Sequence, residues 1–487
     1  MRNIIDLGFE KVNRPIKVLQ FGEGNFLRAF VDYFIDILNE KTDFNGNVAI
    51  VKPISFGSLN NFKKQKNLYT VLLRGRQNGE VVNASRVISS VQKVIDAKDD
   101  YDEYMELAKL PSLRFIVSNT TEAGITLDEN DNFDGLPSTY PGKLTKFLFE
   151  RFKAFGGDKE KGLIILPVEL IDNNGKELKR CVLALSKIWN LGEDFVEWLN
   201  TANVFCSTLV DRIVTGYPRG YADKVFDELG YEDNLVDIGE PFALWVIESD
   251  KDISDELPFE KAGLPIVFTG DVKPYKQRKV RVLNGAHTAS VLVSYIGGIN
   301  IVRDMMNDEI FGTMARKIVD TEIVPNVPLP IDDVKDFADS VYERFDNPFI
   351  DHELLSISLN SVSKWRARVL PSFKDNYNKN RKIPKLLTFS FAGLLAFYCS
   401  ADLREDGLHS NRNDGTEYIV HDDADVLKIF AENSIKSEED YVKVIASNVD
   451  FWGEDLTKYD NFVSDVTNYL IKIKQSPVCA VKYILED

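Results

Sequence analysis

Histidine and cysteine are scarce in this sequence, which limits the metal and disulfide chemistry open to it. Four of each occur among 487 residues. The cysteines contain no Cys-x-x-Cys pair, so the sequence indicates neither a zinc site nor a disulfide framework, and a reducing cytoplasm is the expected location. His352, His409 and His421 have no second histidine or cysteine at ligand spacing. We therefore expect no bound metal.

Long hydrophobic runs are also missing. The longest apolar stretch, residues 386–401, is interrupted by polar residues and is shorter than the roughly 20 residues that a membrane span requires. It predicts a buried helix. Residues 1–9 carry charges without a continuous apolar run, so they do not resemble a secretory signal. We expect a protein that stays inside the cell and does not contact membranes.

Basic residues are fewer than acidic ones. Acidic residues number 76 against 59 basic ones, which gives a formal net charge of −17. This excess repels phosphate backbones and anionic surfaces, so nucleic acid is not an expected partner. We found neither an internal repeat nor a low-complexity segment. The length exceeds that of one typical core and predicts two domains, or three.

The first part of the chain alternates between strand and helix patterns. A β-type run at residues 16–21 is followed by Gly22-Glu-Gly24 and then by a helical pattern from Phe26 to Leu38 with one apolar face. Further elements continue the alternation: β-type runs at 48–51, 69–73, 115–118 and 163–166, and a helical pattern at 101–110. The sequence therefore predicts an α/β fold with a doubly wound, Rossmann-like parallel sheet.

The second part is mostly helical. From Leu283 onward helical patterns dominate, as at residues 311–319 and 334–345. We place the domain boundary at about residue 270. The prediction is a Rossmann-like dinucleotide-binding domain over residues 1–270 and a mostly helical catalytic domain over residues 271–487.

The glycine turn after the first strand suits a dinucleotide. Glycines between a first strand and a helix let backbone amides approach a pyrophosphate, and the helix N-terminus adds partial positive charge. Gly22 and Gly24 are placed for this role, but Leu27 replaces the third glycine of the usual fingerprint. From these residues alone, a plain structural turn is an equally good interpretation.

A second motif brings together groups suited to ketone reduction. The stretch Lys279-Val-Arg-Val-Leu-Asn284-Gly-Ala-His287 holds an amine, an amide and an imidazole, whose donors can stabilise negative charge on a carbonyl oxygen. On an α-helix Asn284 and His287 share a face, but Lys279 falls about 140° away. Convergence therefore requires an irregular helix start or a preceding strand. The alternative is a buried helix with a core histidine and a basic edge.

Lys279 is suited to proton transfer. Its ammonium donates a proton in the reducing direction, but in the oxidising direction it must first lose one. Its pKa, ordinarily ~10.4, would have to fall toward roughly 7 to 8 through desolvation or nearby positive charge. Lys276, Arg278 and Arg281 are the candidates for that charge.

Both motifs resemble a known family, the mannitol dehydrogenases, or polyol-specific long-chain dehydrogenases. Residues 21–30 resemble its Gly-x-Gly-x-Phe-x-Arg-Ala-His signature, with Phe30 in place of the histidine, and the Lys-x4-Asn-x2-His spacing is similar. Residues 117–124 match a further segment, beside the nicotinamide ribose in that family. The resemblance implies cofactor binding by Phe21, Gly22, Gly24, Asn25, Phe26, Asn119 and Thr121. It also implies that Lys279 is the general acid/base and that Asn284 and His287 bind the substrate oxygen.

Two lines of reasoning disagree on whether the cofactor is NAD or NADP. An acidic residue after the second strand would bind the ribose 2′-hydroxyl and select NAD. Here Lys52 follows Val51, and a lysine there favours the 2′-phosphate of NADP. The family resemblance implies NAD. We expect NAD, with NADP as the alternative.

Several residues are candidates for substrate recognition. Lys364, Arg366 and Arg368 form a local positive cluster in an acidic protein, and arginine suits a carboxylate. The alternative is a solvated basic turn. Asp211 and Arg212 match a family segment near the domain junction, with an interdomain ion pair as the alternative. Leu170 stands where mannitol dehydrogenases have an asparagine, which puts a fourth contact to the oxygen in doubt.

A closer resemblance points to family members of bacterial hexuronate breakdown. It is carried by residues 19–30, 142–145, 150–152 and 361–368, and it implies a small sugar-acid substrate, with reversible NADH-dependent reduction of D-tagaturonate to D-altronate. Reduction of fructuronate, or of fructose to mannitol, is the nearest alternative. A dinucleotide-sensing protein without catalysis is the alternative outside enzymes. The sequence makes no prediction of oligomeric state.

Overall fold

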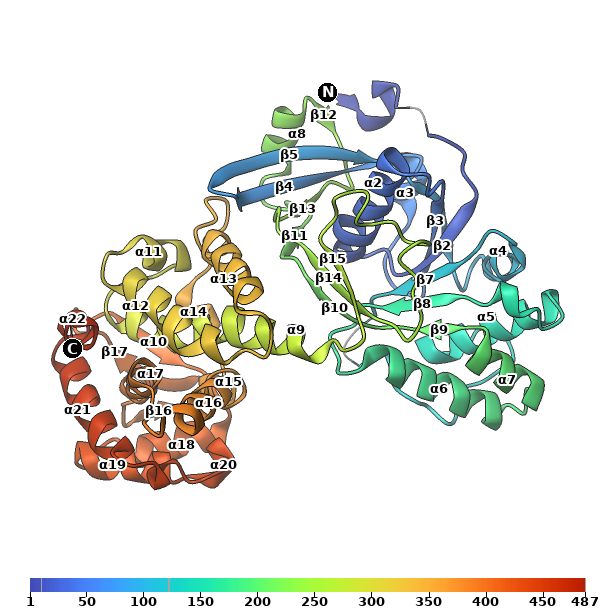
Figure 1. Cartoon of the computed structure of the whole chain (residues 1–487). Helices are drawn as coiled ribbons and strands as arrows, with labels where there is room; N and C mark the ends of the chain where they lie inside the picture. Colours follow the sequence, from blue (N-terminus) through green and yellow to red (C-terminus); the bar gives the residue numbers. More distant parts are fainter. Residues whose placement is uncertain (10, 121–122, 487) are drawn as a thin grey trace. The chain divides into compact units, whose positions relative to one another are not determined.

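The computed structural model describes residues 1–9, 11–120 and 123–486. The chain divides into two compact units (Figure 1). Unit 1 comprises Met1–Arg74 and Val82–Val272, and unit 2 comprises Gly75–Val81 and Lys273–Asp487. Each unit has its own architecture.

A six-stranded parallel sheet forms the centre of unit 1. Its order is β6-β3-β2-β7-β8-β9, which corresponds to 3-2-1-4-5-6 along the chain and is the doubly wound order of dinucleotide-binding domains. The strand order reverses at β2, which has β3 on one side and β7 on the other. The predicted fold is confirmed. The strands are β2 (Ile16–Phe21), β3 (Asn47–Lys52), β6 (Val91–Asp96), β7 (Phe115–Ser118), β8 (Ile164–Pro167) and β9 (Val204–Phe205).

Both faces of this sheet are buried, because alternate residues of each strand point to opposite sides. Val18 faces one cluster, with Phe30 and Phe34 of the first helix and Trp245 of a second sheet. Leu19 and its counterparts on the neighbouring strands face the other cluster. The helices of unit 1 are α1 (Asn25–Leu27), α2 (Tyr33–Lys41), α3 (Asn60–Lys64), α4 (Tyr101–Glu106), α5 (Tyr140–Ala154), α6 (Asn174–Ile188), α7 (Glu193–Thr201) and α8 (Ala222–Leu229).

The strand predicted at residues 69–73 does not join the parallel sheet. It is part of β4 (Tyr69–Gln77), which forms a hairpin with β5 (Glu80–Ile88) in a separate sheet of order β11-β13-β4-β5. Asn78 and Gly79 link the strands with φ of 54° and 80°, and Asn-Gly is a strong two-residue hairpin signal. The remaining strands of unit 1 are β1 (Arg2–Asn3), β10 (Ser207–Asp211), β11 (Val214–Gly216), β12 (Tyr231–Glu232), β13 (Asp237–Gly239), β14 (Leu244–Glu248) and β15 (Ile266–Thr269).

Unit 2 is mostly helical, as predicted, and α10 (Gly285–Ile296) lies at its centre. Gly393 of α17 (Lys385–Phe397) lets the two helices approach closely, because an added Cβ would lie 3.2 Å from Cβ of Val293. A small sheet, β16 (Asp402–Arg404), β17 (Gly407–Asn411) and β18 (Glu417–Val420), accompanies the helices. These include α9 (Lys273–Arg278), α11 (Val302–Asn307), α12 (Phe311–Lys317), α13 (Ile331–Phe345), α14 (Leu354–Ile357), α15 (Ser361–Arg368), α16 (Leu370–Asn380), α18 (Ala424–Asn433), α19 (Glu438–Ala446), α20 (Val449–Trp452), α21 (Phe462–Gln475) and α22 (Pro477–Glu486).

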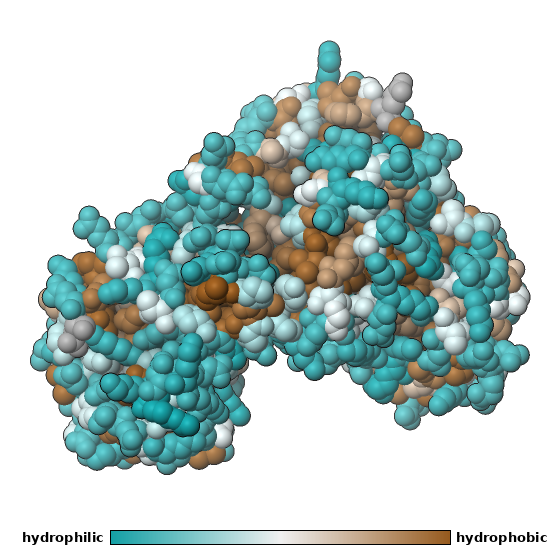
Figure 2. Space-filling view, in the orientation of Figure 1, coloured by the Kyte–Doolittle hydropathy of each residue, from teal (hydrophilic) through white to brown (hydrophobic). Residues whose placement is uncertain are grey.

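The longest apolar stretch of the sequence forms a buried helix. In α17 Leu387, Phe391 and Leu394 have no exposed surface, which matches the expectation. Within the described residues, every helix is too short or too polar to cross a membrane. Hydrophilic residues cover most of the face shown in Figure 2.

Candidate active site

The Gly22–Gly24 turn lies at the carboxyl end of β2, where the strand order of the sheet reverses. Gly22 has a φ of 122°, and its amide donates a hydrogen bond to the carbonyl of Val51 over 2.9 Å. An added Cβ at Gly22 would lie 3.2 Å from Cδ1 of Leu27 and 3.4 Å from the carbonyl oxygen of Asn119. The backbone conformation therefore favours glycine at this position, and a Cβ would also have to displace the Leu27 side chain slightly.

One continuous helix follows this turn. It consists of α1 (Asn25–Leu27), the π-helical segment η2 (Arg28–Asp32) and α2. Gly24 precedes its first residue in an extended conformation, so the free amides of the first helical turn lie at the switch point of the sheet. This arrangement fits a dinucleotide pyrophosphate.

The other predicted cofactor residues have different surroundings. Asn119 follows β7, and its amide donates to the carbonyl of Phe21 over 3.2 Å, which joins the ends of the two strands. The ring of Phe21 packs in the core against Tyr104 and Tyr140, so its backbone alone is available at the turn. Phe26 stacks on Phe30 at 5.0 Å between ring centroids. Thr121 lies outside the described residues.

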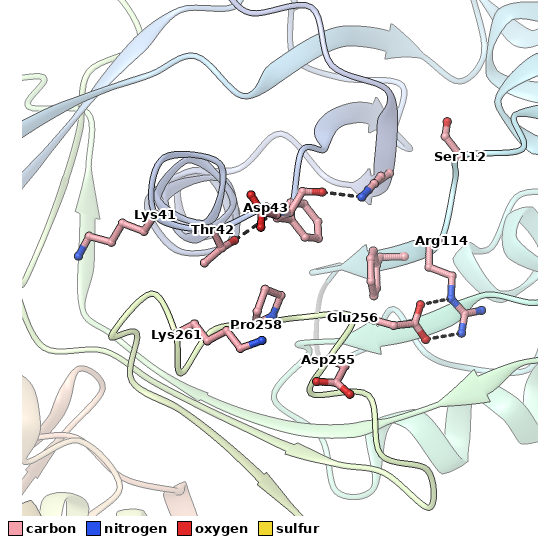
Figure 3. A pocket seen from close by; sticks show the side chains of 12 residues that line it. Lys41, Thr42, Asp43, Ser112, Arg114, Asp255, Glu256, Pro258 and Lys261 are labelled. Carbon is pink, nitrogen blue, oxygen red and sulfur yellow. Dashed lines mark hydrogen bonds and ion pairs between the residues drawn. The ribbon is translucent and has the colours of Figure 1, made fainter.

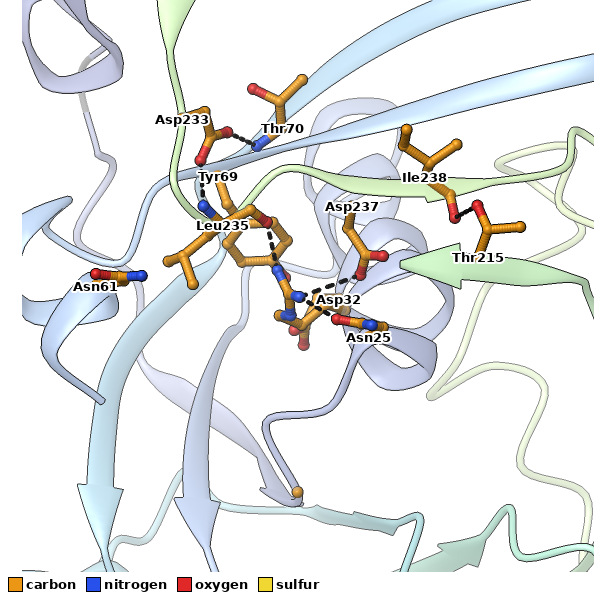
Figure 4. A network of polar contacts seen from close by, with 12 residues as sticks. Asn25, Asp32, Asn61, Tyr69, Thr70, Thr215, Asp233, Leu235, Asp237 and Ile238 are labelled. Atoms are coloured by element: carbon orange, nitrogen blue, oxygen red, sulfur yellow. Dashed lines mark hydrogen bonds and ion pairs between the residues drawn. The ribbon is translucent and has the colours of Figure 1, made fainter. Parts of the chain in front are cut away.

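Arg28, the first residue of η2, was missed as a functional candidate by sequence reasoning. Its buried guanidinium donates to Oδ1 of Asn25 and to the carbonyl of Leu235, each over 2.5 Å, and lies 3.6 Å from a carboxylate oxygen of Asp237 (Figure 4). Arg28 thus positions the side chain of Asn25. The sequence feature that could have identified Arg28 is its position on the apolar side of the predicted helix, where a charged residue is unexpected.

Buried acids lie behind the turn. Tyr69 donates to Oδ2 of Asp32 over 2.7 Å, and Gln20 donates to the carbonyl of Gly22 over 3.1 Å and to Asp32 over 3.4 Å. Burial raises the pKa of Asp32 to about 7, although the hydrogen bonds from Tyr69 and Gln20 oppose it. Burial raises the pKa of Asp237 to about 7 as well, against the attraction of Arg28.

In unit 2 the predicted triplet begins in an irregular helix. Residues Lys279–Asn284 form the π-helical segment η5, which leads directly into α10. A π-helix bonds residue i to residue i+5 and turns less per residue than an α-helix, so residues five apart lie closer to one face than they would in an α-helix. Lys279 and Asn284 are therefore brought nearer to one face, and His287 lies in the first turn of α10. This is the irregular start that their spacing required.

His287 lies in a crowded, positively charged environment. Its ring is 4.0 Å from that of Phe345 and 5.5 Å from that of His352, between centroids. Its Nδ1 is buried without a hydrogen-bond partner among the described residues. Burial, followed by the charges of His352, Arg344, Arg368 and Lys364, holds the pKa of His287 well below its usual range. The imidazole is therefore neutral near pH 7.

The three basic residues of α15 do not all point the same way. Lys364 and Arg368 are four residues apart and share a helix face. Nζ of Lys364 donates to the carbonyl of Ile357 over 2.9 Å, and Arg368 lies 3.5 Å from Oγ1 of Thr288, next to His287. Arg366 instead donates to the carbonyl of Asp450 over 3.2 Å. The structure brings Lys364 and Arg368 toward His287 and places Arg366 elsewhere.

Gly285 permits this approach. An added Cβ there would lie 3.1 Å from the carbonyl oxygen of Arg368 and 3.6 Å from that of Val280. The glycine between Asn284 and His287 therefore lets α15 pack directly against the start of α10.

The cations expected around Lys279 have partners of their own. Arg278 lies over the ring of Phe337 at 4.5 Å and donates to the carbonyl of Asp333 over 3.4 Å. Arg281 pairs with Asp375 at 2.5 Å. Burial lowers the pKa of Lys276. The Asp375 carboxylate therefore offsets the positive charge that Arg281 was expected to provide.

Arg212 has a structural role in unit 1. It donates to the carbonyls of Ala29, Pro241 and Phe242, and it lies against the rings of Phe30, Tyr33 and Phe34. Burial lowers its pKa to about 10. Asp211 is buried in β10, opposite Leu244. Both side chains therefore belong to the interior of unit 1.

A cavity of about 450 Å³ lies at the opposite edge of the parallel sheet (Figure 3). It is lined by Lys17 and Phe115, at the amino ends of β2 and β7. Arg114 on its wall forms two hydrogen bonds with Glu256, of 2.5 and 2.7 Å. Because the glycine turn is at the carboxyl ends of the strands, this cavity is separate from the dinucleotide site.

Two family models match nearly the whole chain. The mannitol dehydrogenase Rossmann domain matches residues 16–261, and the mannitol dehydrogenase C-terminal domain matches residues 271–474. The chain belongs to the mannitol dehydrogenase family.

Relatives within this family include proteins named altronate oxidoreductase. Those from Escherichia coli and Shigella flexneri are each 43% identical to this chain over 478 residues, which cover 96% of this chain and 97% of the relative. The match therefore spans both units.

Solved structures share the fold. A D-sorbitol dehydrogenase in substrate-free form has a TM-score of 0.77 and 21% identity. Pseudomonas fluorescens mannitol 2-dehydrogenase, in a ternary complex with NAD and D-mannitol, has a TM-score of 0.66 and 20% identity. Each match covers 98% of this chain and 96% of the other.

Proposed function

We propose that this protein is a cytoplasmic enzyme that interconverts D-tagaturonate and D-altronate with NADH and NAD. One observation carries the proposal: the 43% identity to altronate oxidoreductases over 96% of the chain. The sugar acid is a small-molecule substrate. At this identity the match extends through both the glycine turn and the lysine-containing motif.

Unit 1 provides the dinucleotide site in this proposal. The backbone of residues 22–25 would hold the pyrophosphate, with Asn119 at the neighbouring strand end. Thr121 is a further cofactor contact by its match to the family segment. When bound, NADH supplies the hydride. Arg28 fixes Asn25 through a 2.5 Å hydrogen bond, and Gln20 fixes the carbonyl of Gly22. These contacts hold the turn in one conformation before the cofactor arrives.

Unit 2 provides the proton chemistry. In the reducing direction the ammonium of Lys279 donates its proton to the ketone oxygen, and in the oxidising direction the neutral amine accepts the hydroxyl proton. Asn284 donates a hydrogen bond to the same oxygen. His287 donates as a neutral imidazole, since its pKa lies well below the usual range. Donors aimed at this oxygen stabilise the negative charge that develops there.

The carboxylate of the sugar acid binds to Lys364 and Arg368. Both act on His287 electrostatically, as does Arg344, so three cations surround the proposed position of the substrate oxygen. Burial lowers the pKa of Arg368, and an anion beside it would offset that cost. A neutral ketose has no carboxylate to bind Lys364 and Arg368.

The test is NADH oxidation by the purified protein with D-tagaturonate, D-fructuronate and D-fructose in parallel. We expect the highest kcat/KM with D-tagaturonate. Activity with D-fructose alone would overturn the carboxylate site. NADH binding without turnover of any of the three would favour the dinucleotide-sensing alternative.

A further inference from the structure

The carboxyl ends of β3 and β6 carry an ion pair that the dinucleotide site does not otherwise explain. Lys52 ends β3 and Asp96 ends β6, and the two residues are paired in the strand register. Nζ of Lys52 lies 2.8 Å from Oδ2 of Asp96, and the lysine side chain is 4% exposed. The carbonyl of Lys52 also accepts a hydrogen bond from the amide of Ala97 over 3.1 Å. The pair is fixed by both backbone and side chain.

The N–H groups of the Lys52 ammonium already donate to acceptors within the protein. Besides Asp96, it donates to the carbonyls of Phe56 and Gly57 over 3.4 and 3.3 Å. An ammonium has three N–H donors, so these three acceptors match its full capacity. A phosphate could bind Lys52 only by displacing one of them.

Asp96 is held in its charged form. Burial alone would raise its pKa, but the hydrogen bonds from Lys52 and from the amides of Lys98 and Asp99 outweigh burial and lower it. The carboxylate therefore stays ionised at every pH at which the enzyme would work.

A second carboxylate faces the same pair. Glu23 lies between the two glycines of the turn, and its charge interacts with both Lys52 and Asp96. The turn is tied to this end of β3, because the amide of Gly22 donates to the carbonyl of Val51. Burial raises the pKa of Glu23. When both carboxylates are ionised, the formal charges of Lys52, Asp96 and Glu23 sum to −1.

In a doubly wound domain, the end of the second strand contacts the adenosine ribose of the dinucleotide. The residue at the end of the second strand meets the 2′-hydroxyl of NAD or the 2′-phosphate of NADP. A hydroxyl donates readily to a carboxylate, whereas a phosphate is repelled by it. Lys52 occupies that position in β3, but Asp96 neutralises it.

We propose that Asp96 is the specificity-determining residue that makes this enzyme select NADH over NADPH, by occupying Lys52 and repelling a 2′-phosphate. The inference rests on the proposed function, since it assumes dinucleotide binding at the Gly22–Gly24 turn. It explains how a lysine at a position that normally favours NADP is compatible with NAD.

The test compares the Kd of NADH and of NADPH by calorimetry, together with kcat/KM for both, in the wild type and in Asp96→Asn. Asparagine keeps an acceptor for Lys52 but removes the negative charge. We expect the ratio of the NADPH Kd to the NADH Kd to fall about 10-fold or more, which corresponds to about 1.4 kcal/mol. Asp99→Asn removes the same charge three residues away, at an exposed position, and should change the ratio less than about 2-fold.

Two further variants make the result decisive. Asp96→Asn/Lys52→Gln should lose the gain in NADPH affinity, because the gain requires the positive charge of Lys52 that Asp96 no longer neutralises. Glu23→Gln should shift the ratio in the same direction by a smaller factor, and it tests the proposal if Asp96→Asn does not fold. An unchanged ratio in both Asp96→Asn and Glu23→Gln, with NADH binding intact, would overturn this inference and leave the proposed function standing. A wild type that binds neither dinucleotide would overturn both.

Discussion

Arg366 and Arg368 lie two positions apart on one short helix but face different surroundings. Arg368 is directed toward Thr288 and His287, whereas Arg366 contacts Asp450. This difference provides a matched pair for the carboxylate site. Two arginines that are equivalent in the sequence should have unequal effects on a charged substrate.

We predict that Arg368→Ala raises the KM for D-tagaturonate about 10-fold or more, because a hydrogen bond to a charged group contributes about 1.5–3 kcal/mol. Activity with D-fructose should change little, and Arg366→Ala should leave both substrates nearly unaffected. Steady-state kinetics of the two variants with both ketones check this. Equal losses for Arg366→Ala and Arg368→Ala would contradict the assignment.

Asp32 is a buried carboxyl group behind the glycine turn. Its ordinary pKa, which applies in the unfolded chain, is ~3.9, and burial raises it to about 7 in the folded protein. The folded state therefore binds the proton more tightly. Between these two pH values the folded state keeps a proton that the unfolded state has lost, so the free energy of unfolding falls as the pH rises toward about 7.

We predict that Asp32→Asn becomes more stable relative to the wild type as the pH rises from about 4 to about 7. At the lower pH both side chains are neutral and accept from Tyr69, so the variant and the wild type should have similar stability. The measurement is the thermal unfolding midpoint of both proteins across this range. A difference in midpoint that does not change with pH would show that Asp32 does not titrate there.

At the scale of elements, the contact between η5, α10 and α15 sets the geometry of the proposed substrate site. Gly285→Ala would bring a Cβ to 3.1 Å from the carbonyl of Arg368 and should push α15 away from the triplet. We predict a fall in kcat/KM of about 10- to 100-fold, because small displacements of catalytic groups are costly. The stability should fall by about 1–3 kcal/mol.

Gly393→Ala is the control for this change. Its Cβ would meet Val293 at 3.2 Å, so it creates a similar close contact on the side of α10 that faces α17. We expect a comparable loss of stability with a much smaller loss of activity. If both variants lost activity equally, the effect of Gly285→Ala would be one of general packing.

Some elements were predictable because their signals are local. The run of residues 16–21, the two glycines and the apolar face after Phe26 lie consecutively in the sequence, and they form β2, the turn and the first helix. The hairpin of β4 and β5 was missed although Asn78-Gly79 signals it, because residues 69–73 were interpreted as one more strand of the parallel sheet. The five-residue spacing of Lys279 and Asn284 indicated an irregular helix but not its π-helical form.

Other features depend on contacts between distant segments. The pairing of Lys52 with Asp96 follows from the register of β3 and β6, which sequence patterns do not specify. For that reason the sequence favoured NADP at Lys52, whereas the structure shows a neutralised lysine. The division of Arg366 and Arg368 likewise depends on what packs against each face of α15.

At the scale of the whole molecule, the proposed function assigns the dinucleotide to unit 1 and the proton chemistry to unit 2. Unit 1 has the strand order and the glycine turn of a dinucleotide site, and unit 2 has the lysine, asparagine and histidine of the family motif next to a pair of cations. The protein has a net charge of −17, so a group of cations near His287 is unusual for this chain and suits the binding of an anion. A sugar acid has both a carbonyl group for the lysine motif and a carboxylate for the cations.

The most direct test of this account is the altronate-dependent reduction of NAD, followed by the absorbance of NADH, for the wild type and Lys279→Ala. We predict turnover by the wild type and a loss of at least about 100-fold in kcat for the variant, with NADH binding retained. Lys335→Ala, at an exposed position of α13, should behave as the wild type. Full activity of Lys279→Ala, or no altronate-dependent rate in the wild type, would contradict the account.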